Sequence, residues 1–154
     1  QRTNMTAAIA NRGFYYTPHI VQAVENDTIP SRFKEAKHTL IDSAHFSIII
    51  KGMQEVVEDK ELGTANAARL DSVTVCGKTG TAQNPHGEDH SIFIAFAPKE
   101  NPKIALAVYV ENGGWGSTWA VPIGSLLIEE YLTDSIQRKA LESFILEGQI
   151  DYPE

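Results

Sequence analysis

Residues 91–110, SIFIAFAPKENPKIALAVYV, contain two apolar runs separated by a short turn with a proline at each end. Each run is long enough to form a strand, and so short a connection allows antiparallel pairing but no crossover. Successive residues in both runs are apolar, so both faces of the resulting sheet need a cover. We therefore expect strands over 91–97 and 103–110 that form an antiparallel hairpin buried between helices.

Segments with helical features could supply these covers. In the clearest one, an Asp42-Ser43 cap signal precedes apolar residues at helical spacing: Phe46, Ile49, Ile50, Met53, Val56 and Val57. We also expect strands over 17–24 and 71–77, a polar loop over 25–37, and helices over 1–12, 121–132 (apolar face Ile123, Leu126, Leu127 and Tyr131) and 134–146. The predicted fold class is α/β (α+β), an antiparallel sheet flanked by helices, in a single domain over 1–154.

Composition narrows the function classes. The chain has 154 residues, with 13 Lys and Arg against 20 Asp and Glu, which gives a formal net charge of −7. This acidic balance argues against general nucleic-acid binding, which needs a basic surface. No segment approaches the ~18–20 apolar residues of a membrane span, and residues 1–6 do not resemble a secretory leader.

Cysteine and histidine residues give little sign of a metal or redox centre. The one cysteine, Cys76, excludes an internal disulfide and is expected to be a small buried side chain. His86 and His90 flank a turn and do not share a helix face, so we expect no metal site there. No cofactor is predicted.

The most informative stretch for function is residues 77–83, GKTGTAQ, at the end of the expected 71–77 strand. Alternation along a strand places Thr79 and Thr81 on one face and Lys78 on the other. Gly80 leaves no side chain between the threonines, so a substrate can lie against backbone N–H groups suited to a carbonyl or an oxyanion. Two hydroxyls and a nearby ammonium suit a small carboxylate. The same residues are also compatible with an ordinary strand-to-turn transition.

The Lys78–Thr81 stretch, KTGT, resembles the third of three motifs, Ser-x-x-Lys, Ser-x-Asn and Lys-Thr-Gly, of the penicillin-recognising serine enzymes. The likeness extends to 8–13 (AIANRG) with 16–21 (YTPHIV), to 53–65 (MQEVVEDKELGTA), and to 89–98 (DHSIFIAFAP) with 110–114 (VENGG). Together these stretches cover most of residues 1–132. They resemble the transpeptidase domain of class B penicillin-binding proteins, in particular the elongation-type members.

The resemblance implies a peptidoglycan D,D-transpeptidase. In that family an active-site serine attacks a stem peptide, D-Ala leaves, and an amine of a neighbouring stem accepts the acyl group. The implied ligands are peptidoglycan stem peptides and β-lactams. The parent protein would be anchored in the inner membrane, face the periplasm and work with the cell-elongation machinery.

The resemblance also implies roles for individual residues. Lys78 would organise the proton network, and the hydroxyls of Thr79 and Thr81 would hold the substrate carboxylate. The backbone N–H of Thr81 would form half of the oxyanion hole. The implied substrate-binding residues are Lys78, Thr79, Gly80, Thr81, Ala82 and His90, the last at the rim of the cleft.

Two of the three family motifs lack a counterpart. No Ser-x-Asn occurs in the chain, and the one Ser-x-x-Lys, Ser31 to Lys34, follows Pro30 in a polar loop. A nucleophile of this kind needs the start of a buried helix and a desolvated lysine. We therefore interpret the chain as the C-terminal portion of a larger transpeptidase domain, inactive by itself. The missing elements would leave apolar faces unpaired, so we expect self-association or a partner fragment.

Two alternatives remain open. A β-lactamase or β-lactam-sensing receptor domain also uses a Lys-Thr-Gly strand, although 89–98 and 110–114 favour the transpeptidase. A non-catalytic peptide-binding module is compatible with the absence of the other two motifs.

Three further features have structural interpretations. We interpret Thr64 as a helix cap. Trp115 and Trp119 are expected to pack over the end of the sheet. The polar face of the last helix, including Arg138, is expected to be solvated.

Overall fold

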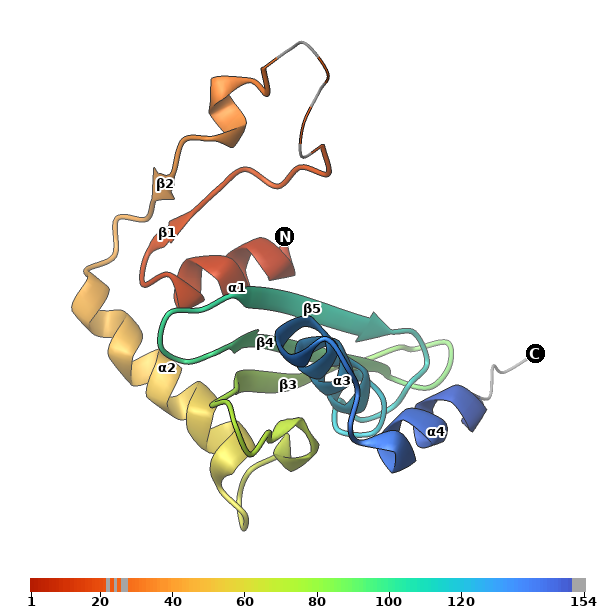
Figure 1. The fold of residues 1–154 in the computed structure, drawn as a ribbon. Coiled ribbons are helices and arrows are strands. Elements are labelled where there is room, and N and C mark those ends of the chain that lie inside the picture. Colours follow the sequence, from red (N-terminus) through yellow and green to blue (C-terminus); the bar gives the residue numbers. More distant parts are fainter. Residues whose placement is uncertain (22, 24, 26–27, 151–154) are drawn as a thin grey trace.

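A three-stranded antiparallel sheet forms the centre of the molecule (Figure 1). The computed structural model describes residues 1–21, 23, 25 and 28–150. The strands are β3 (Cys76–Ala82), β4 (His90–Ala97) and β5 (Ile104–Val110), in this spatial order. Helices α1 (Arg2–Ala10) and α2 (Ser43–Glu58) pack on one face, and α3 (Ala120–Thr133) covers the other. The predicted fold class is confirmed.

Each face of the sheet has its own core. Phe93 and Ala95 of β4 pack with Val121 and Ile128 of α3. On the opposite face, side chains of α1, α2 and the sheet come together: Ala10, Phe46, Ile50, Met53, Cys76 and Phe96. Cys76 is fully buried, as expected, and this burial raises the pKa of its thiol to about 11.

The hairpin predicted over 91–110 is present. Strand β4 pairs antiparallel with β5, with Ser91 opposite Val110 and Ala97 opposite Ile104. Strand β3 adds to the other side of β4, also antiparallel. The apolar hairpin therefore brings the 77–82 segment to one side of a sheet whose two faces are buried.

The predicted cap signals act where expected. The Asp42 carboxylate accepts a hydrogen bond from the Ala44 N–H, 2.9 Å, at the start of α2. Helix α1 ends at Ala10, two residues before the expected boundary. Gly13 follows with φ +116°. Its N–H donates to the Ala8 carbonyl, 2.9 Å, and so gives a hydrogen-bond donor to one of the last carbonyls of the helix.

The remaining elements are short. They are β1 (Phe14–Tyr15), the 3₁₀ helix η1 (Ser31–Phe33), β2 (Lys37–His38), the 3₁₀ helix η2 (Asn66–Ala68) and α4 (Lys139–Glu147). The described residues of 14–38, which we call the arm, extend away from the sheet and α1 (Figure 1). Among the described residues, no helix has both the length and the apolar character needed to cross a membrane.

The strand expected over 17–24 is wrong for its described part, since residues 17–21 and 23 form no strand, and residues 22 and 24 lie outside the described residues. The ladder forms earlier, where Phe14 pairs with His38 and Tyr15 with Lys37. Pro18 has no N–H to donate to a ladder. An apolar run without a partner strand does not become a strand.

The strand expected over 71–77 begins at Cys76 instead. Leu70 and Val73 form an isolated antiparallel bridge, so the chain turns tightly before β3 starts. The Lys-Thr-Gly-Thr motif therefore lies within a strand and not at its end.

The expected apolar face of α3 is partly wrong, because Leu127 and Tyr131 are exposed. The helix turns a face with small residues to the sheet instead. A Cβ atom at Gly124 would lie 2.7 Å from a Phe93 ring carbon. The backbone of α3 therefore approaches the sheet more closely than a residue with a side chain at position 124 would allow. The face of α3 that is buried is thus set by how closely the helix packs on the sheet, and not by the number of large apolar residues on that face.

Arg138 is not part of a solvated face, because α4 starts only at Lys139 and Arg138 turns inward. Its Nε donates to the carboxylate of Glu129, 2.9 Å, and Glu129 is only 5% exposed. Its other nitrogens donate to the carbonyls of Ala67, 2.7 Å, and Ser125, 3.0 Å. This cluster ties α3, η2 and the start of α4 together.

Candidate active-site strand

Strand β3 lies at an edge of the sheet, and among the described strands it has one neighbour, β4. Lys78 and Thr81 are exposed, while Thr79 and Gly80 are partly buried. The motif is therefore presented along an open edge and is not enclosed between strands.

The register assigns the motif side chains to faces. Residues directly opposite each other in antiparallel strands point to the same face. Thr79 is opposite Phe93, which packs in the core beneath α3, and Thr81 follows two residues later on the same face. Lys78 is opposite Ile94, which packs against the other core. The predicted separation of the two threonines from the lysine holds in the structure.

The backbone of β3 offers hydrogen-bonding groups at its open edge. Gly80 lies directly opposite Ile92. A Cβ atom at Gly116, in the loop above, would lie within 3.2 Å of the Gly80 N and O atoms and of the Ile92 carbonyl oxygen. These atoms are therefore close together, as expected for a pair that exchanges ladder hydrogen bonds. Residues on either side of such a pair direct their N–H and C=O groups outward. Consistent with this, the Lys78 ammonium donates to the Thr79 carbonyl, 2.8 Å. The Thr81 N–H then also faces the open edge.

Gly80 leaves room on the Lys78 face and not between the two threonine side chains. A Cβ atom there would lie 3.5 Å from the Ile92 Cβ, an ordinary contact. Nothing within the described chain requires glycine at this position. The space it leaves is consistent with an external group approaching the strand.

The loop after β5 lies directly on the backbone of the motif strand. A Cβ atom at Gly116 would lie 2.7 Å from the carbonyl oxygens of Gly80 and Ile92, so only glycine permits this approach. The buried Ser91 hydroxyl anchors the loop, since it donates to the Trp115 carbonyl, 2.9 Å, and accepts from the Ala120 N–H, 3.1 Å.

The two tryptophans of this region differ, and only Trp115 departs from expectation. The Trp115 side chain is exposed, so it does not pack over the end of the sheet. Trp119 stacks on Phe144 of α4, with ring centroids 5.6 Å apart. It therefore joins the loop to the last helix.

His90 lies directly opposite Ala82 at the end of the motif strand. Its Nδ1 accepts a hydrogen bond from the Asn112 N–H, 3.1 Å, and its ring packs against Tyr109, with centroids 5.2 Å apart. The imidazole thus holds the turn that follows β5. Its predicted contact with substrate stays a prediction. In the described ranges, no three His, Cys, Asp or Glu side chains gather in a way that could hold a metal ion.

Thr64 is the residue that sequence reasoning missed. It caps no helix, because α2 is capped by Asp59 and η2 by Ala65. Its hydroxyl instead lies 2.8 Å from the hydroxyl of Thr79 in the motif. No local signal links the two residues, since the contact depends on how the turn after α2 reaches β3.

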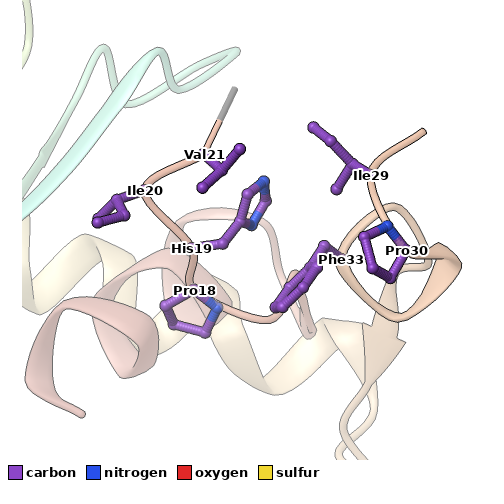
Figure 2. Close-up of a pocket in the computed structure, with 7 residues that line it drawn as sticks. All are labelled: Pro18, His19, Ile20, Val21, Ile29, Pro30 and Phe33. Carbon is purple, nitrogen blue, oxygen red and sulfur yellow. The ribbon is translucent and has the colours of Figure 1, made fainter. Parts of the chain in front are cut away.

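The described residues of the arm do not form the buried helix start that a Ser-x-x-Lys nucleophile needs. Ser31 and Lys34 are exposed on and beside η1, as the sequence predicted. Helix η1 belongs to the arm, which extends away from the sheet (Figure 1). The arm encloses a hollow of about 390 Å³. Figure 2 shows the residues that line it, with 18–21 facing 29–30 and Phe33. Its lining is almost entirely apolar apart from the His19 ring, which packs on Phe33 at 4.9 Å between centroids. The hollow offers few groups for catalysis.

An edge strand carrying Lys-Thr-Gly-Thr, with an antiparallel hairpin beside it and a helix across one face, defines the class to which this chain belongs. Residues 1–129 match the family model of the penicillin binding protein transpeptidase domain, and the chain is a member of that family.

Individual relatives agree with this assignment. The chain is 30% identical over 155 residues to the peptidoglycan D,D-transpeptidase MrdA of Haemophilus influenzae, a match that covers 88% of this chain and 24% of that protein. The crystal structure of Pseudomonas aeruginosa PBP2 in complex with WCK 5153 superimposes with a TM-score of 0.74 at 35% identity, covering 86% of this chain and 29% of that one.

A third relative is the PBP2 of Helicobacter pylori, solved in complex with MreC, with a TM-score of 0.66 at 28% identity. That match covers 86% of this chain and 24% of the other. The chain thus spans about a quarter of the length of the relatives that it matches.

Proposed function

We propose that this chain is the C-terminal part of the transpeptidase domain of a longer peptidoglycan D,D-transpeptidase of the elongation type. The observation that carries the proposal is the exposed edge strand β3, which holds Lys78, Thr79 and Thr81 in a fixed alternation. The share of its relatives that the chain covers, about a quarter, supports the view that the remaining catalytic elements lie in other parts of the protein.

In the proposed reaction, a serine outside this chain attacks the carbonyl of the penultimate D-Ala of a stem peptide. The C–N bond to the terminal D-Ala breaks, that D-Ala leaves, and an amine of a second stem then displaces the serine. The residues of this chain bind and polarise the substrate. The hydroxyls of Thr79 and Thr81 donate hydrogen bonds to its terminal carboxylate, and the ammonium of Lys78 adds positive charge nearby.

The backbone of β3 contributes to the chemical step. The Thr81 N–H, directed to the open edge, donates to the oxygen on which negative charge develops during attack. Ala82 and His90 extend the binding surface toward the 83–89 turn. The loop at Gly116 lies directly on the backbone of Gly80, which keeps the edge in place for the substrate.

The proposal extends to partners and location. β-Lactams would acylate the same serine, as implied by a family named for penicillin binding. The Helicobacter pylori PBP2 was solved with MreC, which supports a partner of that kind for the longer protein. We place the domain on the periplasmic face of the inner membrane. The β-lactamase and sensor alternatives are not favoured by relatives that are named transpeptidases.

Labelling with a fluorescent penicillin tests the proposal. The purified 154-residue chain should remain unlabelled, whereas the longer protein that contains it should form a covalent adduct. Replacing Lys78 by Ala in the longer protein should reduce labelling strongly, while Lys139→Ala, on the exposed side of α4, should not. Labelling of the chain alone, or no labelling of the longer protein, would contradict the proposal.

A further inference from the structure

The turn between α2 and η2 brings a hydroxyl to the motif strand from a distant part of the fold. Thr64 Oγ1 lies 2.8 Å from Thr79 Oγ1, within hydrogen-bonding distance for two hydroxyls. The two residues are fifteen positions apart and belong to different elements. The contact is therefore made by tertiary structure.

The turn that carries Thr64 is built to hold its position. The Ala65 N–H donates to the Val56 carbonyl, 2.9 Å, and the Asn66 side-chain amide donates to the carbonyls of Val57, 3.1 Å, and Asp59, 2.7 Å. Ala65 is itself buried in the core. Hydrogen bonds of the two residues that follow Thr64 thus tie the turn to α2 and to Asp59.

A hydroxyl has one hydrogen to donate and two lone pairs to accept with. If Thr79 donates its hydrogen to a substrate carboxylate, the Thr79 oxygen can only accept in its contact with Thr64. Thr64 must then be the donor in that contact. The two hydroxyls then form a directed chain in which Thr64 donates to Thr79 and Thr79 donates to the substrate. Linked hydrogen bonds of this kind polarise and strengthen one another.

We propose that Thr64 is a positioning residue for carboxylate recognition, which orients the Thr79 hydroxyl toward the substrate. This inference rests on the proposed function, because it assigns a new residue to the same site. Serine at position 64 would preserve the directed chain, whereas valine, of nearly the same shape, would remove its donor.

The test measures second-order acylation rates of the longer protein with a penicillin and with the methyl ester of the same penicillin, which lacks the carboxylate. The Thr64→Val variant should acylate about 2- to 10-fold more slowly with the free acid, the range expected for one neutral hydrogen bond. Its rate with the ester should not change. Thr64→Ser should recover most of the rate with the free acid, and Leu62→Ala, an exposed position in the same turn, serves as the control.

A double-mutant cycle with Thr79→Val adds a second criterion. Once Thr79 has lost its hydroxyl, Thr64→Val should have no further effect, because the two residues act in series. Equal rates for Thr64→Val and the wild type, an equal loss with acid and ester, or additive effects of the two substitutions would overturn the inference while leaving the proposed function in place. A wild-type protein that no penicillin acylates would overturn both.

Discussion

Phe93 is held between two glycines. A Cβ atom at Gly77 would lie 2.6 Å from the ring of Phe93, and one at Gly124 would lie 2.7 Å from it. Neither distance leaves room for a methyl group. The glycine that begins the GKTGT stretch therefore serves packing, whereas Gly80 within it has no such constraint.

We expect Gly77→Ala to lower the free energy of unfolding by about 1–3 kcal/mol, because a methyl group would displace a fully buried ring. Gly52→Ala is the matched control. Gly52 lies within α2 with nothing near its missing Cβ, so alanine there should stabilise the chain by about 0.5–1 kcal/mol. Urea unfolding of both variants measures the difference, and equal stabilities would contradict the packing described for Phe93.

The turn after α2 depends on an exposed carboxylate. Asp59 Oδ1 accepts hydrogen bonds from the N–H groups of Leu62, 3.0 Å, and Glu61, 2.9 Å, and these donors hold the pKa of Asp59 below its usual value of 3.8. Because the pKa is lower in the folded chain, the stabilisation is present above pH 3.8. It is lost as the pH falls through the folded-state pKa.

Titration of the Asp59 carboxyl by NMR should therefore give a midpoint below 3.8. The stability difference between the wild type and Asp59→Ala should be constant from pH 5 to 7 and should shrink below pH 3.8. A midpoint at or above 3.8 would show that the two N–H groups do not hold the carboxylate.

Arg138, directly before α4, pairs with the buried Glu129 of α3 and donates to the Ala67 carbonyl of η2. Replacing Arg138 by Ala would leave the Glu129 carboxylate buried with its charge unpaired, and we expect a loss of about 3 kcal/mol. Lys139→Ala, which removes an exposed ion pair with Glu142, should cost less than ~0.5 kcal/mol. Similar losses for the two variants in thermal unfolding would argue against a buried cluster.

Three features could be predicted because each depends on local signals. They are the hairpin, the cap of α2 and the position of the motif next to the hairpin. The apolar runs at 91–110 and the Asp42 cap need only neighbouring residues. The prediction of a strand over 17–24 is wrong for its described residues, because strand formation also needs a partner strand, which no local pattern supplies. The predicted apolar face of α3 is partly wrong, because Gly124 lets that helix approach Phe93 directly.

The same distinction applies to the candidate site. Thr79 and Thr81 share a face as strand alternation predicts. Thr64 reaches Thr79 from another element, and its own neighbours in sequence contain no sign of this. The sequence likewise predicts a solvated Arg138, because it does not show that Glu129 is buried beside this residue.

At the scale of the whole molecule, both β3 and β5 are edges among the described strands. Large apolar side chains are also exposed, with Ile20 at 101%, Leu40 at 107% and Leu62 at 83%. Free edges and exposed apolar side chains both favour association. We expect the 154-residue chain to self-associate unless a partner covers these surfaces.

Light scattering over a range of concentrations measures this directly. The average mass should rise above the 16.9 kDa of one chain as concentration increases. A variant with Ile20→Lys and Leu40→Lys should shift the equilibrium toward the single chain. A wild-type chain that stays at 16.9 kDa at high concentration would contradict the expectation.

The central claim is that the open edge of β3 binds the substrate carboxylate. A crystal structure of the longer protein acylated by a penicillin tests this most directly. The account predicts the penicillin carboxylate within about 2.6–3.2 Å of the Thr79 and Thr81 hydroxyls, and the acyl oxygen at the same distance from the Thr81 N–H. An acylated protein whose ligand carboxylate lies away from β3 would contradict it.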